Sequence, residues 1–319
     1  MSAAPQIVRY GELQPCRTAF IDAHTPGSDQ KENFTIIGGG VSESADQHVH
    51  IAEAIGFNIG AAGQVPECRN SLHSHRTAEV FFVLSGRWRF YWGLHGDAGE
   101  VILEEGDIFN IPTGIFRGFQ NVGTDYGMIM AILGGDDAGG GVIWAPHVIE
   151  DARAHGLVLG EDGKLYDSKQ GVTPPDGVGP MPLLSEEELK DYPEPTTREV
   201  LPRHVARYND LCAMADREPV VVIGETGVLP DKPGFEVALV TRRSATSDLH
   251  RHDRASVLMP VTGHWRVVWD GGEDTLAPGD TMLVPADLDH AVYPSMTGDA
   301  ALYHITATDD PAGATWTGA

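Results

Sequence analysis

The stretch HSHRTAEVFFVLSG, residues 73–86, recurs 177 positions later as HRHDRASVLMPVTG, residues 250–263. Each copy begins with two histidines that are separated by one residue, and each copy ends in a glycine. The residues between them are largely apolar, which favours a buried strand that is stopped by the glycine. The repeat predicts that one folding unit occurs twice in the chain.

A second shared block follows each copy. GDIFNIPTGIFR, residues 106–117, matches GDTMLVPADLDH, residues 279–290, in its first glycine and in its proline. The separation between the copies falls from 177 to 173 residues between the two blocks, so the difference in length is confined to one turn. Because two copies are too few for an open array, each copy must bury a core of its own.

The residues around these blocks predict short strands. Trp88, Phe90 and Trp92 alternate with other side chains at a period of two, which is typical of a half-buried strand. Pro112 and Gly114 end another apolar run with turn chemistry. Closely spaced strands with glycine and proline between them predict an all-β barrel or sandwich in each copy.

The region between the copies has a different composition, with proline and glycine near residues 173–181. Residues 146–155, followed by a glycine, predict a short helix, and Ser185 with Glu188 predicts a capping box. We therefore expect short linking helices between the barrels. The expected organisation is an N-terminal arm (1–50), a first barrel (51–140), a linker (141–217) and a second barrel (218–319).

Composition limits the classes of partner. The 46 acidic and 22 basic residues give a formal net charge of −24, which repels phosphate backbones, so we expect no nucleic-acid partner. The three cysteines are scattered and odd in number, which fits a reducing compartment better than a disulfide framework. No secretory segment and no bilayer-spanning run is visible, so we expect a cytoplasmic protein with no membrane partner.

The paired histidines indicate metal chemistry. Two histidines one residue apart on a strand place both imidazoles on one face, and a third from a neighbouring strand completes a set that leaves positions open for substrate. In the second copy the candidate metal ligands are His250, His252 and His290. Tyr303 and His304 lie on a nearby predicted strand, and strand parity alone leaves open which of them faces the pocket.

The two blocks resemble the two motifs of the cupin superfamily, in which the first motif carries HxH, a glutamate and a glycine, and the second ends in a histidine. With two copies the chain resembles a bicupin, over roughly residues 55–135 and 230–306. The resemblance implies two cupin barrels, of the double-stranded β-helix or jelly-roll type, with a metal in each. It does not define the reaction, because the superfamily includes dioxygenases, decarboxylases, isomerases, lyases and storage proteins.

The second copy departs from the family pattern at Ser256, where the family has glutamate. Three neutral imidazoles leave a divalent ion its full charge, and such an ion favours an anionic, bidentate substrate such as a catechol-type compound, an aromatic hydroxy acid, an enol or a diketone. The histidine segment is similar to that of gentisate-type dioxygenases with three histidines, although their working site lies in the first cupin. We expect Ser256 to take part in catalysis by hydrogen-bonding to oxygen or substrate.

The first copy offers His73, His75 and Glu79 but has Arg117 in place of the last histidine. A guanidinium stays protonated and cannot bind a metal. Either Arg117 pairs with Glu79 in a vestigial or substrate-anchoring site, or the two histidines and the glutamate form a working metal triad. In the second case Arg117 would bind a carboxylate of the substrate beside the metal.

Three functional hypotheses follow. The favoured one is a non-haem Fe(II) dioxygenase, an oxidoreductase that uses O2 and a small chelating substrate. The second is a lyase, isomerase or decarboxylase that uses Zn, Mn or Ni, although the sequence shows no unambiguous general base. The third is a non-catalytic bicupin that binds a small ligand. By analogy with cupins that exchange arms, the N-terminal arm also suggests a homodimer.

Overall fold

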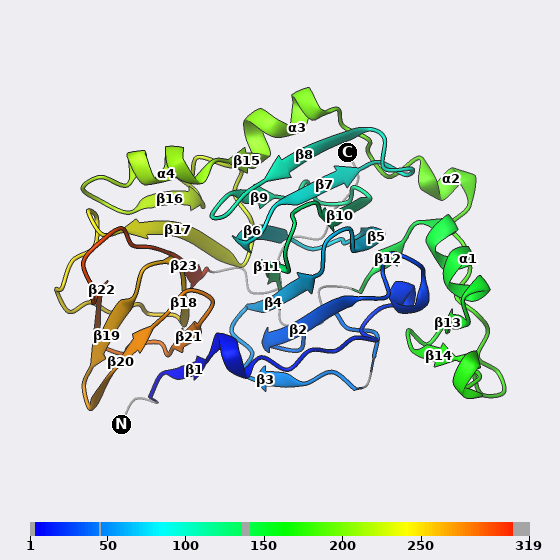
Figure 1. Ribbon diagram of the computed structural model, residues 1–319, viewed down its shortest axis with the longest axis horizontal. Coiled ribbons are helices and arrows are strands. Elements are labelled where there is room, and N and C mark those ends of the chain that lie inside the picture. The colour runs from blue at the N-terminus through cyan, green and yellow to red at the C-terminus, as the bar shows by residue number, and fades with distance from the viewer. Residues whose placement is uncertain (1–3, 45, 136–140, 309–319) are drawn as a thin grey trace.

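The computed structural model describes residues 4–44, 46–135 and 141–308. Two β-structured bodies lie side by side, and the segment that connects them runs as a series of short helices over the first body and then over the edge of the second (Figure 1). The expected all-β fold of two barrels with short helices is therefore confirmed. Among the described residues, no helix combines the length and the apolar character needed to cross a bilayer.

The first barrel is built from a seven-stranded and a five-stranded sheet. In spatial order the larger sheet contains β15 (Val205–Ala206), β9 (Ile108–Asn110), β6 (Glu79–Ser85), β11 (Gly127–Gly134), β4 (Phe57–Gln64), β2 (Lys31–Ile37) and β3 (Val49–Ile51). The smaller sheet contains β12 (Ile143–Trp144), β5 (Arg69–Ser74), β10 (Arg117–Asn121), β7 (Trp88–Trp92) and β8 (Gly99–Leu103).

The second barrel repeats this plan with fewer strands. Its larger sheet contains, in spatial order, β1 (Gln6–Val8), β21 (Thr281–Val284), β18 (Ser256–Thr262), β23 (Ala301–Ala307), β17 (Phe235–Thr241) and β16 (Val220–Ile223). Its smaller sheet contains β20 (Gly272–Leu276), β19 (Trp265–Trp269) and β22 (His290–Pro294). Nearly all strand pairs in both barrels are antiparallel, and the exception is the pairing of β2 with β3.

The connecting segment contains α1 (Pro146–Ala154), a hairpin of β13 (Leu157–Leu159) and β14 (Leu165–Asp167), η3 (Ser168–Gln170), α2 (Glu186–Leu189), α3 (Thr197–His204) and α4 (Tyr208–Met214). The predicted helix and the predicted capping box are both present, with the Ser185 hydroxyl accepting from the backbone of Glu188. Part of this segment completes the first barrel, because β15 pairs with β9.

The N-terminal arm is shared between the two barrels. Its first strand, β1, pairs with β21 of the second barrel, whereas β2 pairs with β4 of the first. The short helices η1 (Tyr10–Glu12) and η2 (Ile21–His24) lie between these strands. Arg9 also reaches the second barrel, where its guanidinium donates to Asp280 at 2.9 Å.

The apolar run of β6 is buried on both faces because the barrels pack against each other there. Val80, Phe82 and Leu84 belong to a core cluster that includes residues of both barrels. Phe81 and Val83 point the other way, into the interior of the first barrel. This arrangement explains why the repeated block is almost uninterruptedly hydrophobic rather than alternating.

Candidate metal centre

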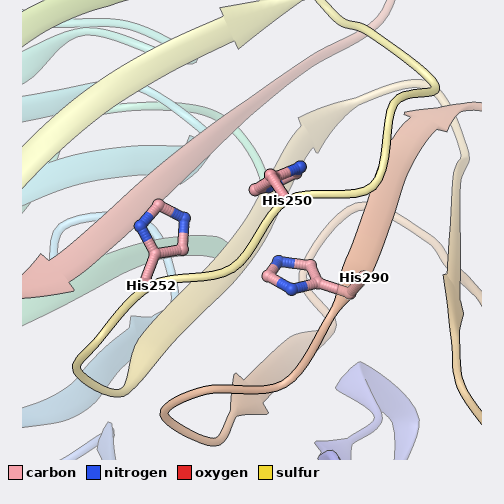
Figure 2. A group of neighbouring side chains, drawn as sticks. All are labelled: His250, His252 and His290. Atoms are coloured by element: carbon pink, nitrogen blue, oxygen red, sulfur yellow. The ribbon is translucent and has the colours of Figure 1, made fainter.

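Three imidazoles converge in the second barrel, as Figure 2 shows. His250, His252 and His290 each offer one ring nitrogen, and these three atoms lie within 4.8 Å of one another. The ring centroids of His250 and His290 are 4.5 Å apart, and those of His250 and His252 are 5.5 Å apart. The structure therefore brings together all three ligands that the sequence indicated for this barrel.

Backbone contacts fix how these rings are held. The amide of His250 donates to the carbonyl of His290 at 2.9 Å, and the amide of His290 donates back at 2.9 Å. The Nδ1 atom of His290 lies 2.9 Å from the carbonyl oxygen of Leu288, and that of His250 lies 3.2 Å from the carbonyl oxygen of Asp248. With Nδ1 held by a carbonyl, the Nε2 atom is free for a metal, as in most histidine metal sites.

The turn before His290 preserves the repeated motif with a different residue. Asp287 has φ 59°, where the first copy has Gly114 with φ 86°. Aspartate is among the few residues other than glycine that adopt this left-handed conformation readily. The amide of Asp287 donates to the carbonyl of His252 at 2.7 Å, so the turn also positions the second ligand.

The sequence placed both HxH pairs on strands, and this prediction is only partly correct. β5 ends at Ser74, so His73 is on a strand and His75 follows it. In the second barrel His250 makes only an isolated bridge to His290, and His252 lies in a loop. The rings still converge, because the bridge holds His250 against the strand that carries His290.

The electrostatics of the three rings suit metal binding. Burial and the neighbouring imidazoles lower the pKa of His252, and burial lowers the pKa of His290 to about 4. Neutral imidazole is the form that binds a metal. The Nε2 atoms of His252 and His290 are buried and have no hydrogen-bond partner in the described part of the chain. Buried polar atoms are normally satisfied, so these residues fit a bound cation.

A pocket of about 260 Å³ opens beside the three rings. It is lined by His250, His252 and His304 together with mainly apolar side chains, among them Leu258 and Val292. None of the described residues that line it is Asp, Glu, Lys or Arg. The pocket therefore offers a substrate apolar walls beside the candidate cation.

Two further polar groups of this barrel lack partners. Ser256, which stands where the first copy has Glu79, is fully buried, and its hydroxyl makes no hydrogen bond to a described residue. His304 lies with its ring 4.9 Å from that of His252, and its Nε2 atom is likewise buried and unpartnered. Burial lowers the pKa of His304 to about 3, so this ring is neutral. Tyr303 points away from the pocket.

The first barrel holds the other predicted group. One ligand atom each from His73, His75 and Glu79 lies within 4.8 Å of the others, and all three residues are buried. Arg117 is also buried, and its guanidinium forms an ion pair with Glu79 and donates to the carbonyl of His73 at 2.9 Å. The cation that replaces the last histidine therefore contacts the carboxylate that would otherwise serve as a ligand.

Charge and burial make the histidines of this barrel poor bases. The pKa of His75 is lowered to about 4 by burial and by the Arg117 guanidinium, and the pKa of His73 is lowered well below its usual value for the same reasons. Burial also lowers the pKa of Arg117, although the charge of Glu79 acts in the opposite direction. The site is thus close to neutral when Glu79 and Arg117 are both charged.

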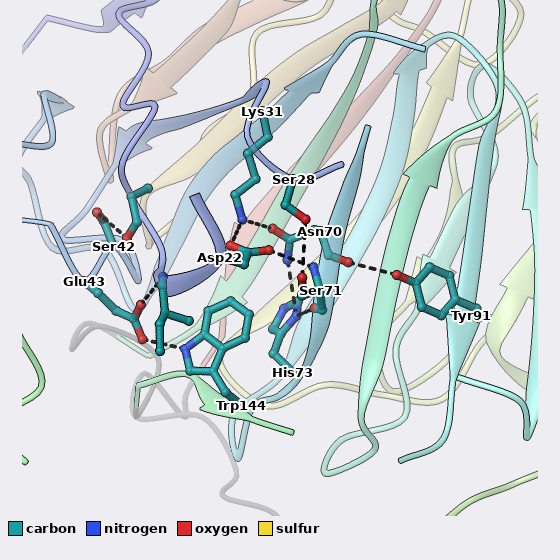
Figure 3. A network of polar contacts seen from close by, with 12 residues as sticks. Asp22, Ser28, Lys31, Ser42, Glu43, Asn70, Ser71, His73, Tyr91 and Trp144 are labelled. Carbon is teal, nitrogen blue, oxygen red and sulfur yellow. Dashed lines mark hydrogen bonds and ion pairs between the residues drawn. The ribbon is translucent and has the colours of Figure 1, made fainter. Parts of the chain in front are cut away.

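A polar network behind His73 fixes its orientation (Figure 3). The Nδ1 atom of His73 lies 2.8 Å from the carbonyl oxygen of Ser71 and 3.3 Å from the side-chain nitrogen of Asn70. Lys31 donates to Asn70 at 2.9 Å and forms a buried ion pair with Asp22. Two of these residues come from the N-terminal arm. No local pattern in the sequence predicts that the arm supports His73, because the contact joins residues that are far apart in the chain.

The arm also encloses the first site. A cavity of about 70 Å³ lies between His73, His75 and Glu79 and arm residues such as Phe20 and Val41. Beside it the half-buried Glu43 accepts from the Trp144 indole at 2.6 Å (Figure 3), and desolvation raises the pKa of Glu43 to about 7. The first cavity is smaller than the pocket in the second barrel.

Comparisons with known proteins agree with this architecture. Residues 63–133 match the family model of the cupin domain. A comparison with curated protein sequences finds no match. Among solved structures, the chain is similar to a formate complex of oxalate decarboxylase from Lactobacillus farciminis, with a TM-score of 0.57 and 14% identity over 99% of this chain and 89% of that chain. It is also similar to a mutant of oxalate decarboxylase from Bacillus subtilis, with a TM-score of 0.53 and 16% identity over 97% of this chain and 78% of that chain.

At these identities the structural likeness concerns the fold alone. Two antiparallel β-barrels that each enclose a histidine cluster define a two-barrel protein with donor sets of the metal-binding type. Residues 63–133 therefore carry a cupin domain, and the whole chain has a two-barrel fold of the bicupin type.

Proposed function

We propose that this bicupin is a metal-dependent enzyme whose working site is the second barrel, and that it acts as a non-haem Fe(II) dioxygenase on a small substrate that chelates through two oxygens. The observation that carries the proposal is the convergence of His250, His252 and His290 beside a pocket that lacks charged side chains. Acid–base chemistry by a carboxylate has no support here, because no Asp or Glu of the described residues lines this pocket.

Each part of the site has a role in this proposal. His250, His252 and His290 would hold the metal, which when bound would supply the redox chemistry with O2. Because all three donors are neutral, the ion would keep its full charge and favour a deprotonated, bidentate substrate. The apolar walls exclude water from the substrate. The Ser256 hydroxyl, which is buried without a partner, would donate a hydrogen bond to a substrate oxygen.

For the first barrel we propose a structural or anchoring role. The ion pair between Arg117 and Glu79 occupies the carboxylate and places a cation where the last ligand would be. A metal would have to displace or approach that cation. The competing interpretation, a metal held by His73, His75 and Glu79 with Arg117 binding a substrate carboxylate, predicts a second metal equivalent.

A second candidate is a non-redox lyase, isomerase or decarboxylase that uses Zn, Mn or Ni as a Lewis acid. It is favoured by the solved structures of similar fold that are oxalate decarboxylases. Oxygen uptake separates the two: the dioxygenase consumes one O2 per turnover, whereas the lyase turns over under argon.

The test of the metal site uses the full chain and its metal content after purification. His290→Ala should lose the bound metal, because only two imidazoles remain. His264→Ala is the matched control, since that histidine is exposed in the same barrel. Ser256→Ala should keep the metal and lose turnover. Full metal retention in His290→Ala would reject the ligand set.

A further inference from the structure

The second barrel has more unpartnered polar groups around its histidine cluster than a metal explains. Buried side-chain atoms without a hydrogen-bond partner include the Nε2 atoms of His252, His290 and His304 and the hydroxyl of Ser256. A cation accounts for the first two, which belong to the ligand group. His304 is outside that group, so a metal held by the three ligands does not account for its buried nitrogen, and a different hydrogen-bond partner is required.

His304 is also a point at which the two barrels differ on their last core strand. It is paired with Leu258 in the second barrel, as Ala131 is paired with Phe81 in the first. Ala131 lines the first cavity and His304 lines the second pocket. A methyl group in one barrel is therefore replaced by a hydrogen-bonding ring in the other, on a strand whose other pocket-lining residue, Leu302, is apolar.

We infer that His304 is a substrate-binding residue that recognises an uncharged polar group of the substrate other than its two chelating oxygens. The inference deepens the proposed function and rests on it. His304 contacts the ring of His252 edge to face, which places it beside the candidate metal and within the same pocket. A substrate that chelates the metal with two oxygens would extend its body along Leu258 and Leu302 and meet the imidazole with a third polar group.

The charge of the pocket defines the class of that third group. No Asp, Glu, Lys or Arg of the described residues lines the pocket, so nothing there would balance a second charge on the substrate away from the metal. Burying an unpaired charge is costly, whereas one neutral hydrogen bond is tolerated and favourable. We therefore expect a hydroxyl, carbonyl or amide group and not a carboxylate.

Metal-loaded full-length protein, prepared without oxygen and with Co(II), tests the inference by calorimetric binding of chelating probes. The probes are catechol, 2,3- and 3,4-dihydroxybenzamide, and the two corresponding dihydroxybenzoates. In the wild-type protein at least one amide should bind about two- to twelvefold more tightly than catechol, since one buried hydrogen bond contributes about 0.5–1.5 kcal/mol. Neither benzoate should exceed the corresponding amide.

His304→Leu should keep one metal per chain, bind catechol within about twofold of the wild-type affinity and lose the advantage of the amide. His304→Gln, which keeps a donor, should recover part of that advantage, and His264→Leu is the surface control.

Equal binding of all probes by wild type and His304→Leu would overturn the inference. Metal loss in His304→Leu would overturn it differently, because His304 would then be a ligand. Tighter binding of a benzoate would refute the uncharged group. A wild-type protein without metal would remove the proposed function and this inference together.

Discussion

The two barrels share their motif spacing and their strand order around the site, but they differ in the pair of residues that sets the charge of that site. The first barrel has Glu79 and Arg117, and the second has Ser256 and His290 at the same motif positions. Both pairs are neutral overall. In the first barrel the charges of Glu79 and Arg117 cancel, and in the second Ser256 and the neutral His290 carry no charge. A glutamate with a histidine would carry a net negative charge that a cation could balance. Neither barrel has that combination, so each copy departs from it at one position in a way that keeps its buried charge balanced.

The comparison shows that two copies of one motif can have the same fold while the residues at their sites differ in charge. In the first barrel the guanidinium of Arg117 stands at the motif position where the second barrel has the candidate ligand His290. In the second the donors are neutral and the pocket is larger, about 260 Å³ against about 70 Å³. We therefore propose that the second barrel binds a cation and an anionic chelator, and that the pairing of Arg117 with Glu79 keeps the first barrel from doing so.

The largest expected effect is a gain of metal in the first barrel. Arg117→His would remove the resident cation and complete a set with His73, His75 and Glu79. We expect the metal content to rise from one to two equivalents per chain, measured by elemental analysis after dialysis. Arg117→Leu is the informative partner variant, because it removes the cation without adding a ligand. The proposed difference between the barrels is wrong if wild-type protein already holds two equivalents or if Arg117→His still holds one.

The buried ion pair gives the next largest effect, on stability. Glu79→Gln leaves the guanidinium of Arg117 buried without its counter-charge, and such a loss costs about 3–5 kcal/mol in the free energy of unfolding. Ser256→Ala at the matching position removes a hydroxyl that has no partner among the described residues, and it should change stability by less than about 1 kcal/mol. Urea unfolding of metal-free protein measures both.

The double variant Glu79→Gln with Arg117→Met separates lost charge balance from lost packing. If the penalty comes from the unpaired guanidinium, the double variant recovers most of the stability lost by the single one. An equal loss in both variants would show that packing around the pair, and not its charge, stabilises the first barrel.

Much of the site could be predicted from the sequence, because the motif spacing fixes turns and strands that carry the ligands. The Pro-x-Gly turn and its counterpart at Asp287 place Arg117 and His290 at the start of equivalent strands. The choice of Glu79 as the partner of Arg117 also followed from charge, since a buried guanidinium requires a counter-ion.

Other features left no signal in a single sequence. His304 has Ala131 as its counterpart, so the repeat does not mark it, and the parity of its strand could be assigned only once the pairing with β18 was known. The division of the N-terminal arm between both barrels depends on pairing between β1 and β21, which are more than 270 residues apart. Contacts of that range are set by packing of the complete fold and not by local preference.

Acidification should weaken both barrels. The pKa values of His75 and His290 are about 4, and that of His304 is about 3, whereas an unfolded histidine titrates near about 6.5. The unfolded chain therefore binds more protons than the folded chain as the pH falls from about 6.5 towards 4, and stability is lost across that window. Glu43, with a pKa of about 7, acts in the opposite direction. Below pH 7 the folded chain holds about one more proton at this carboxyl than the unfolded chain does, which offsets the proton uptake of about one histidine.

Urea midpoints of metal-free protein at pH 7, 6 and 5 measure this dependence. They should fall steadily below pH 6.5, and His304→Leu should show a shallower fall because one titrating group of the second barrel has been removed. An unchanged slope in that variant would mean that His304 takes up its proton over the same pH range in the folded and unfolded protein, contrary to a pKa lowered by burial.

The smallest expected effect concerns the contact between the barrels. The Tyr303 hydroxyl of the second barrel donates to the carbonyl of Gly106 in the first at 2.7 Å, and its ring packs 4.8 Å from that of Phe82. Tyr303→Phe keeps the ring and leaves the carbonyl without this donor, so it should cost about 1–2 kcal/mol in urea unfolding. Because Tyr303 faces away from the pocket while His304 faces into it, metal content and probe binding should not change. A changed probe affinity in Tyr303→Phe would show that the interface between the barrels is coupled to the site, and the two barrels could then no longer be treated as separate units of chemistry.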